Sequence, residues 1–327
     1  MKRFGVVMIG LLLVLSLGIT VFADGAVQWS DLSKKLGPVP KPTKTYTIGC
    51  IEKTLINEHW QEMKKGYEDA ARKLGINVEV SAVQSEQDLV KQLDLTESML
   101  SKKYDAICVS PLTASNLVPA LEKASKAGMP IINVDDSRIT EVPVTSFVGG
   151  DHKLMGVYAA DYFGKKIKSG KVALIEGMAG SPASQQRVEG FTETVRKYKG
   201  LKLVASQPGN WDRIQAMNAA ANIIQVNPDL KAIYACNDTM ALGVMEAVIN
   251  ANKKGKIMVI GTDGVPDAVQ SVREGNLTGT IAAFPYRMGE IAIEVALRAL
   301  QGQKVPPVVV SPMVLVTKDN LSKYFKK

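Results

Sequence analysis

Cysteine and histidine are scarce in this sequence, which limits the kinds of site that it can build. The chain of 327 residues contains 3 cysteines and 2 histidines, and no two cysteines have the spacing of a zinc or redox motif. We therefore expect no disulfide scaffold, no histidine-based metal centre and no cofactor. Cys50, Cys108 and Cys236 all fall in predicted buried strands, which favours free thiols over a disulfide.

Glycine-rich phosphate-binding loops are also missing. Neither GxGxxG nor GxxxxGK followed by serine or threonine occurs, so nothing indicates a dinucleotide site or a P-loop. The basic run Lys165–Lys168 lacks interleaved aromatic residues and lies where a helix should end, a place that suits cations. We therefore expect no nucleic acid among the partners.

The overall composition is that of a packed globular protein. Hydrophobic residues make up 46% of the chain and charged residues 22%, which excludes wholesale disorder. The formal net charge is +8. The length suits about two domains of ordinary size.

The first 23 residues have the order of a secretory signal. Lys2 and Arg3 precede an apolar run over residues 4–22, and Val21-Phe22-Ala23 has the form that a signal peptidase reads. We predict cleavage after Ala23 and a periplasmic protein. The alternative is an uncleaved membrane anchor, because the run is nearly long enough to span a bilayer. Loss of 2 of the 40 basic side chains would leave a net charge of +6.

Residues 24–44 are predicted to form an extended tether. The segment Gly37–Pro42 is rich in proline, which favours an extended backbone. We expect no contribution to a hydrophobic core before Thr45.

Short β-branched, apolar runs alternate with longer segments that have helical spacing. Such alternation predicts parallel sheets covered on both faces, and about ten strand–helix steps are too many for one small sheet. The fold class expected is therefore α/β, with two doubly wound parallel-sheet domains. The predicted strands cover residues 46–51, 78–83, 106–110, 130–134, 146–148, 171–175, 202–206, 232–236, 257–261 and 279–282, and the predicted helices residues 60–74, 89–100, 117–127, 156–167, 216–224, 240–249 and 288–300.

Polar and aromatic side chains follow several of these strands. In doubly wound sheets, ligands bind beyond the carboxyl ends of the strands, so these residues are candidates for ligand contact. Indole rings can cover the C–H faces of a monosaccharide, carboxylates accept bonds from its hydroxyls, and amides and cations donate to its oxygens. The candidates are Lys53, Asn57, His59, Trp60, Asp135, Arg187, Trp211, Asn237 and Asp263, with Arg213 as a further cation.

Each candidate also has a purely structural interpretation. Trp60 continues the apolar stripe of its helix, and Asp212 and Asp238 suit the first turns of helices better than ligand contacts. The remaining structural roles are core packing for Trp211, a helix cap at Asn237 or at one of Asp135 and Asp136, a turn at Asp263-Gly264, and a solvated position for Lys53, Asn57, His59 and Arg187. His152 is expected at the surface or in a helix cap.

Five stretches of the sequence form a specific set when they are taken together. They are Lys53-Thr54-Leu55 with Asn57 and Trp60, residues 63–66, residues 204–208 with Trp211-Asp212-Arg213, residues 232–234 with 237–241, and residues 261–264. This set resembles the periplasmic sugar-binding proteins of ABC transporters, in the ribose- and D-allose-binding group with the type I periplasmic binding fold. The resemblance covers nearly the whole chain from Thr45 onward.

The resemblance implies two lobes joined by a hinge of three crossing strands, with a ligand cleft between them. The N-terminal lobe would comprise residues 45–148 and 283–309, and the C-terminal lobe residues 149–282 and 310–327. Such a protein would capture a monosaccharide by domain closure and deliver it to an ABC transporter permease. It would not be an enzyme.

The resemblance also assigns roles within the cleft. The aspartates at positions 135 and 263 would accept paired sugar hydroxyls, Arg187 and Asn237 would bond to hydroxyl and ring oxygens, and the aromatic rings would sandwich the sugar.

Two positions depart from the family pattern. Ala283 stands where the family often has a glutamine, and His59 stands where related proteins carry a phenylalanine. Losing the glutamine removes a donor and an acceptor, which leaves a sugar alcohol as an alternative ligand. Two further functions stay open, a sensor that presents its ligand to a chemoreceptor and a glycoside hydrolase with Asp135 and Asp263 as its carboxylate pair.

Overall fold

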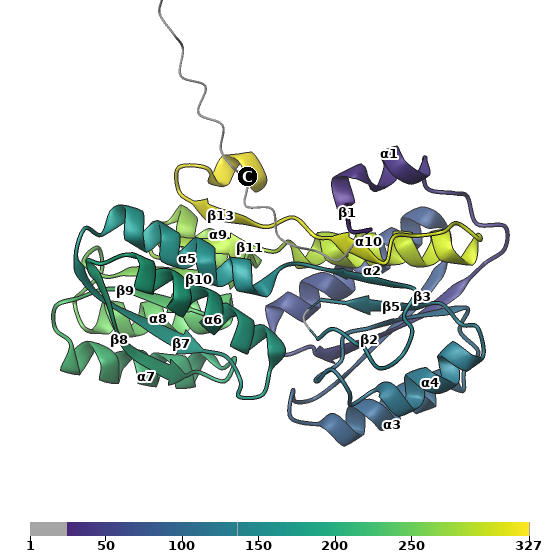
Figure 1. Ribbon diagram of the computed structural model, residues 1–327, viewed down its shortest axis with the longest axis horizontal. Helices are drawn as coiled ribbons and strands as arrows, with labels where there is room; N and C mark the ends of the chain where they lie inside the picture. Colours follow the sequence, from purple (N-terminus) through teal and green to yellow (C-terminus); the bar gives the residue numbers. More distant parts are fainter. Residues whose placement is uncertain (1–24, 136, 327) are drawn as a thin grey trace, which may run out of the picture.

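The computed structural model describes residues 25–135 and 137–326 and shows two α/β lobes side by side (Figure 1). We call the lobe built on sheet A the first lobe and the one built on sheet B the second lobe. Sheet A has the order β1 (Val27–Gln28), β12 (Val308–Val310), β6 (Ser146–Gly149), β5 (Ile131–Val134), β4 (Ala106–Val109), β2 (Thr47–Thr54), β3 (Asn77–Val83). Sheet B has the order β13 (Val314–Thr317), β11 (Gly279–Ala282), β10 (Met258–Asp263), β9 (Leu230–Ala235), β7 (Gly170–Glu176), β8 (Leu201–Pro208).

The described strand pairs are parallel, except that β11 and β13 are antiparallel. The predicted fold class is thus confirmed, and each of the ten predicted strands has its counterpart. The short strands β1, β12 and β13 were not predicted.

Apolar side chains cover both faces of the strands, which explains why the strands read as continuous hydrophobic runs. In β4, Ala106 and Cys108 pack into one core cluster while Ile107 and Val109 pack into another on the opposite face. The first cluster lies under α2 (Glu58–Leu74) and α10 (Pro285–Leu300), and the second under α3 (Leu89–Leu100) and α4 (Val118–Lys126). The second lobe is covered by α5 (His152–Lys166), α6 (Pro182–Lys197), α7 (Arg213–Val226), α8 (Asp238–Asn250) and α9 (Pro266–Arg273).

Glycines set the close approach of the helix pairs that carry site residues. A Cβ on Gly66 of α2 would lie 2.0 Å from the backbone oxygen of Tyr286 at the start of α10. A Cβ on Gly190 of α6 would lie 1.9 Å from the backbone oxygen of Lys153 in α5. Since neither crossing has room for a side chain, the positions of α2 and α6 are tightly fixed.

The segment before Thr45 contributes to the core, so the prediction of a tether that adds nothing to a core is wrong. Strand β1 extends sheet A beside β12, and Leu32 of the short helix α1 (Leu32–Leu36) is 2% exposed within the core of the first lobe. The buried guanidinium of Arg298 donates to the backbone oxygen of Gly37 at 2.9 Å. Tertiary contacts outweigh the extended bias of the prolines here. The predicted signal sequence and its cleavage after Ala23 lie outside the described residues.

The chain passes between the lobes at three places in the part of the molecule that is described. The crossings join β6 to α5, β11 to α10 and β12 to β13 (Figure 1). They are bonded to one another, because Ser311 donates its backbone N–H to Gly149 at 2.9 Å and its hydroxyl to the Ala283 oxygen at 3.2 Å. This is the three-stranded hinge that the resemblance implies.

All three cysteines are free and buried, as predicted. Among residues 25–135 and 137–326, no helix has the length and apolar character needed to cross a bilayer. The same residues contain no cluster of potential metal ligands.

Candidate functional site

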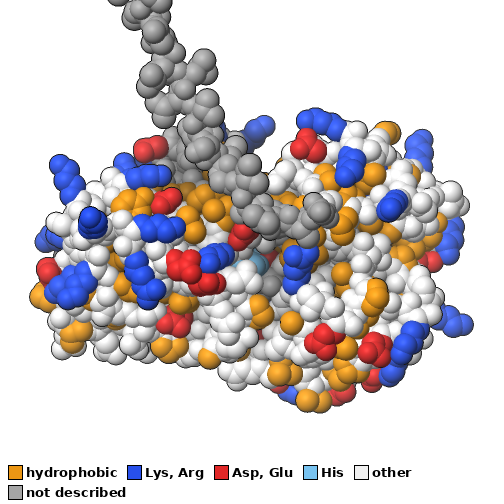
Figure 2. Space-filling model, in the orientation of Figure 1, with side chains coloured by type: hydrophobic (Ala, Val, Ile, Leu, Met, Phe, Trp, Pro, Cys, Tyr) orange, Lys and Arg blue, Asp and Glu red, His pale blue; other side chains and the backbone are white. Residues whose placement is uncertain are grey.

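A small pocket lies between the two lobes at the carboxyl ends of their strands. On the face shown in Figure 2, histidine atoms are visible deep in the furrow that separates the lobes. The first lobe lines the pocket with Asn57, His59, Trp60, Glu86 and Asp135, and the second lobe with Ala183, Arg187, Trp211, Asn237 and Asp263.

The first turn of α2 brings three of these side chains to the pocket. Asn57 is the N-cap residue, and its side chain accepts a hydrogen bond from the His59 backbone N–H at 3.0 Å. This cap fixes where the helix begins and aims His59 and Trp60 at the cleft. The indole N–H of Trp60 donates to Glu86 at 3.3 Å, and the Lys53 ammonium lies 5.6 Å from the centre of the indole ring.

Asp135 follows β5 in a left-handed backbone conformation, with φ of 70°. Its carboxylate lies 3.0 Å from Nε2 of His59, and the residue is 2% exposed. Burial by itself would raise the pKa of this carboxyl, but the charge of His59 and the hydrogen bond to it outweigh burial and hold the pKa below its usual value.

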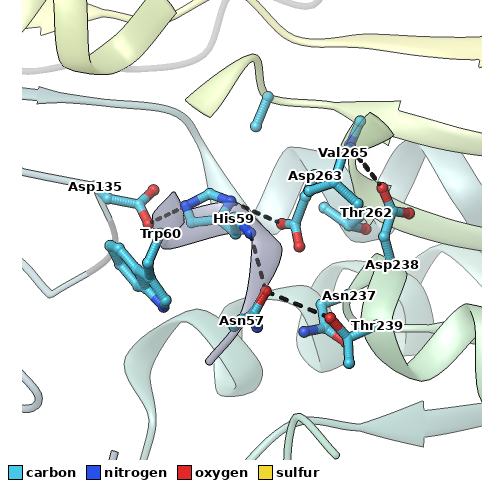
Figure 3. A network of polar contacts seen from close by, with 12 residues as sticks. Asn57, His59, Trp60, Asp135, Asn237, Asp238, Thr239, Thr262, Asp263 and Val265 are labelled. Carbon is cyan, nitrogen blue, oxygen red and sulfur yellow. Dashed lines mark hydrogen bonds and ion pairs between the residues drawn. The ribbon is translucent and has the colours of Figure 1, made fainter. Parts of the chain in front are cut away.

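His59 bridges the two lobes. Its other ring nitrogen, Nδ1, lies 3.5 Å from a carboxylate oxygen of Asp263 on the second lobe, so the ring stands between two carboxylates (Figure 3). Burial would lower the pKa of the imidazole, but the charges of Asp135 and Asp263 raise it well above its usual value.

Arg187 on α6 is the buried cation of the second lobe. It donates to the backbone oxygen of Cys236 at 2.6 Å, contacts Nδ1 of His152 at 3.2 Å and lies 3.6 Å from the Asp263 carboxylate. His152 is only 3% exposed. The expectation that His152 lies at the surface or caps a helix is therefore wrong: Asp151 is the N-cap of α5, and the buried His152 ring contacts the guanidinium of Arg187.

Asp238 shapes the turn that carries Asp263. One of its carboxylate oxygens accepts hydrogen bonds from the backbone N–H groups of Gly264 and Val265 and from the hydroxyl of Thr280, at 2.7 to 3.1 Å. Burial, helped by the charge of Asp263, raises the pKa of Asp238 to about 7. Asp238 is the first residue of α8 and does not line the pocket, which confirms its structural interpretation.

Trp211 and Asn237 complete the wall of the second lobe. Trp211 has a left-handed backbone with φ of 63°, and its ring lies 5.8 Å from the Arg187 guanidinium. Gly177 leaves room for this ring, because a Cβ there would lie 2.1 Å from it. Asn237 lines the pocket and also caps α8, where its side chain accepts from the Met240 N–H at 2.9 Å.

Eight of the nine candidate residues thus meet in one pocket. The exception is Lys53, which is buried on β2 beside the Trp60 ring but does not line the pocket. Arg213, the further cation, pairs with Glu246 at 2.9 Å on the surface of α7 and α8.

Sequence reasoning missed two pocket residues, Glu86 and Ala183. Glu86 follows β3 at the same edge of sheet A, so the rule that selected the other candidates would have found it had it been applied to that strand. Ala183 is a small residue in the first turn of α6, and nothing in the sequence distinguishes it.

Three acidic and two basic side chains line the pocket, and the third carboxylate, Glu86, accepts from the indole N–H of Trp60. The carboxylates of Asp135 and Asp263 face the cations of Arg187 and protonated His59, so the four charges balance. Two indole rings, two carboxamides and the methyl group of Ala183 make up the rest of the lining. This set suits a neutral ligand rich in hydroxyl groups better than a charged one.

A family model described as "Periplasmic binding protein domain" matches residues 48–304 of the chain. The chain belongs to this family. The family predicted from the sequence motifs is thereby confirmed.

Individual relatives agree with this assignment. The chain is 41% identical over 270 residues to the D-allose-binding periplasmic protein of Escherichia coli, a match that covers 80% of this chain and 87% of that protein. It is 34% identical over 274 residues to the ribose import binding protein RbsB of the same organism, covering 84% and 91%. Among solved structures, an ABC transporter periplasmic solute binding protein from Actinobacillus succinogenes with bound D-allose superposes with a TM-score of 0.80. That pair is 36% identical, and the match covers 86% of this chain and all of the other.

Proposed function

We propose that this protein is a periplasmic substrate-binding protein that captures a monosaccharide of the allose or ribose type and delivers it to an ABC transporter permease. The observation that carries the proposal is the division of the pocket lining between the lobes. Carboxylates, cations and indoles of both lobes converge on one small pocket, and relatives with at least 34% identity are named for binding D-allose or ribose.

Capture follows from the position of the hinge. A ligand in the pocket contacts both lobes at once, so only the closed arrangement satisfies its full set of hydrogen bonds. Direct contacts between the lobes add to this closure. The Thr239 hydroxyl donates to Asn57 at 3.3 Å, and the Asp267 N–H donates to Glu58 at 3.4 Å.

Three pocket residues carry a buried polar atom that has no hydrogen-bond partner among the described residues: one is Nδ1 of His59, which contacts Asp263 as an ion pair at 3.5 Å, and the other two are well placed for sugar hydroxyls. Oδ1 of Asp135 and Nε of Arg187 have no hydrogen-bond partner among the described residues. A buried polar atom left unpaired costs about 1–3 kcal/mol. A hydroxyl that accepts from Arg187 and another that donates to Asp135 would remove this cost, which supports a polyhydroxylated ligand.

Export to the periplasm is part of the proposal. It rests on the signal-like leader of the sequence and on the periplasmic names of relatives. The proposed sequence of events is capture in the periplasm, closure, and docking of the closed form on the permease. A role as a ligand sensor for a chemoreceptor stays a prediction.

A thermal-shift panel tests the proposed ligand class. D-allose, D-ribose and other monosaccharides should raise the melting temperature of the mature protein in a concentration-dependent manner, because they bind the folded state alone. Mass spectrometry of ligand released from the purified protein identifies any sugar carried through preparation. Failure of all panel members to stabilise a protein shown to be free of carried ligand would contradict the proposal.

Sugar alcohols are the second candidate class, and Ala283 is the observation that favours them. This residue is 1% exposed at the crossing between β11 and α10, and its methyl group stands where the family often has a glutamine. A ligand that makes one hydrogen bond fewer to the protein would fit a site in which alanine replaces this glutamine. Xylitol and myo-inositol therefore belong in the panel, and stronger stabilisation by either one than by any aldose would select this class.

Hydrolysis of a glycoside fits the geometry poorly. A hydrolytic carboxylate pair must flank the scissile bond, whereas here the imidazole of His59 lies between Asp135 and Asp263. Aryl glycosides incubated with the protein should be recovered unchanged.

A further inference from the structure

His59 is the one pocket side chain that contacts a carboxylate of each lobe. Nε2 lies 3.0 Å from Asp135 of the first lobe, and Nδ1 lies 3.5 Å from Asp263 of the second. The His59 side chain is only 5% exposed, so water hardly screens these contacts. Asp135 and Asp263 contact the two nitrogen atoms at the edge of the His59 ring and not the face of the ring (Figure 3).

This geometry selects one protonation state. A neutral imidazole has one N–H and one lone pair. With its proton on Nε2 it turns the Nδ1 lone pair toward Asp263, and with its proton on Nδ1 it turns the Nε2 lone pair toward Asp135. Only the imidazolium can donate to both carboxylates, so each neutral form sets a lone pair against a buried negative charge.

The other charged groups around the ring do not reverse this preference. Arg187 and His152 lie beyond the carboxylates, where Arg187 shares Asp263 with His59 and binds His152. Glu52 near the end of β2 is fully buried, and burial raises its pKa well above the usual value, which favours its uncharged acid. Lys53 faces the Trp60 ring. The N-terminal end of α2 disfavours a cation by its dipole, an effect smaller than that of two buried carboxylates in contact.

We propose that His59 is a positioning residue that takes up one proton from solvent as the lobes close and, in its protonated form, holds Asp135 and Asp263 in place to receive the ligand. The proton converts neutral imidazole to imidazolium, and no other bond is made or broken. In the open form His59 still contacts Asp135 but no longer contacts Asp263, so its proton affinity is lower than in the closed form. This inference rests on the proposed function and assigns His59 a role other than that of a ring covering the sugar.

The sign of the pH dependence follows directly. Closure raises the proton affinity of His59, so the closed form is favoured fully below the pKa of the open form. That advantage is lost as pH rises through the pKa of the closed form. Within this window, uptake of one proton makes the Kd for the ligand rise by about tenfold per pH unit at most.

Calorimetry with D-allose measures the proton directly. Titrations of the wild-type protein in phosphate and in Tris, whose ionisation enthalpies differ, give the number of protons bound per sugar. As pH rises through the titration of His59, the number of protons taken up per sugar should reach a maximum that approaches one, and the Kd should rise over the same interval. Identical binding enthalpies in the two buffers at every pH, with a constant Kd, would overturn the inference while leaving the proposed function intact.

Two variants test whether the proton is taken up by His59 or by another titratable group. His59→Phe, which places the ring type of related proteins here, and His59→Gln, which keeps a polar but neutral group, should both bind D-allose without proton uptake. Both retain Glu52, His152 and Asp238. If either binds the sugar with the wild-type proton uptake, the proton belongs to one of these groups and the inference is wrong.

The chain has two histidines, so imidazole NMR gives a second readout. Nitrogen-15 spectra of the D-allose complex should show both nitrogens of His59 protonated at pH 7.5, with His59→Phe identifying the signals of His152. If no panel member binds the wild type at pH 6, the proposed function fails. The sugar-free titration of His59 then decides the inference, because in the open form His59 keeps Asp135 alone: a midpoint lowered by Asp135→Asn and unchanged by Asp263→Asn supports the inference, and any other result overturns it.

Discussion

The two lobes support their halves of the pocket by different means. In the second lobe Asp238 binds the turn after Asp263, and Cys236 and His152 bind Arg187, whose Nε alone has no hydrogen-bond partner among the described residues. In the first lobe the Asp135 carboxylate has one side-chain partner, His59, and its Oδ1 has none among the described residues. The second lobe is thus the preorganised half, and the first lobe gains part of its order when His59 reaches Asp263.

Removing each aspartate in turn gives the largest expected effect. Asp135→Ala and Asp263→Ala should each weaken binding of D-allose by more than about 2 kcal/mol, or about thirtyfold in Kd. Asp263→Ala should cost more, because it leaves both Arg187 and His59 without this carboxylate. Calorimetry at pH 6 measures both. Near-wild-type affinity in both variants would show that the ligand site lies elsewhere, and a larger loss at Asp135 would reverse the comparison.

Asp238 tests the internal support of the second lobe. Its pKa of about 7 in the folded protein exceeds the ordinary value of 3.8, so the folded state keeps a proton that the unfolded state releases. Its contribution to stability is therefore greatest at low pH and declines as pH rises from about 4 to 7, by up to about tenfold in the folding equilibrium per unit.

The matched variant Asp238→Asn retains an acceptor for the Gly264, Val265 and Thr280 donors and cannot titrate. Urea unfolding of both proteins at pH 5 and pH 6 measures the effect. Between pH 5 and pH 6, the free energy of unfolding of the wild type should fall relative to that of Asp238→Asn. A constant difference between them would show that Asp238 is ionised throughout.

The indole rings provide the finest comparison. Trp60→Phe should weaken D-allose binding by about fivefold, since it loses a hydrogen bond of about 1 kcal/mol to Glu86. Trp211→Phe should have a smaller effect, because Trp211 is held by ring contacts with Arg187 and Gly177 that a phenyl ring partly keeps. Glu86→Gln serves as the control, since glutamine still offers an acceptor to Trp60. Equal losses in the two tryptophan variants would argue against the Glu86 contact.

Much of the fold could be predicted because its signals are local. Buried parallel strands read as short apolar runs, helices carry their own periodicity, and caps such as Asp212 stand next to the residues that they bond. The candidate site followed from one further rule, that residues after parallel strands gather at the same edge. That rule brought Asp135 and Asp263 into the same set although they belong to different sheets.

Contacts between residues that are far apart in the chain could not be predicted from the sequence. His152 is buried because α5 packs closely on α6, and Leu32 is buried because the N-terminal segment folds back on the first lobe. For neither His152 nor Leu32 do the adjacent residues in the sequence indicate which distant residues it will contact.

The alternation of strands and helices by itself determined that the chain forms two parallel-sheet lobes with polar residues after the carboxyl ends of the strands. This was possible because the spacing of apolar residues in helices, and the continuous apolar runs of buried strands, are visible in short segments of sequence. Only the tertiary structure decided that His59 stands between carboxylates of both lobes. Its charge depends on groups that the hinge brings together, and such proximity is set by the packing of whole lobes rather than by any local pattern.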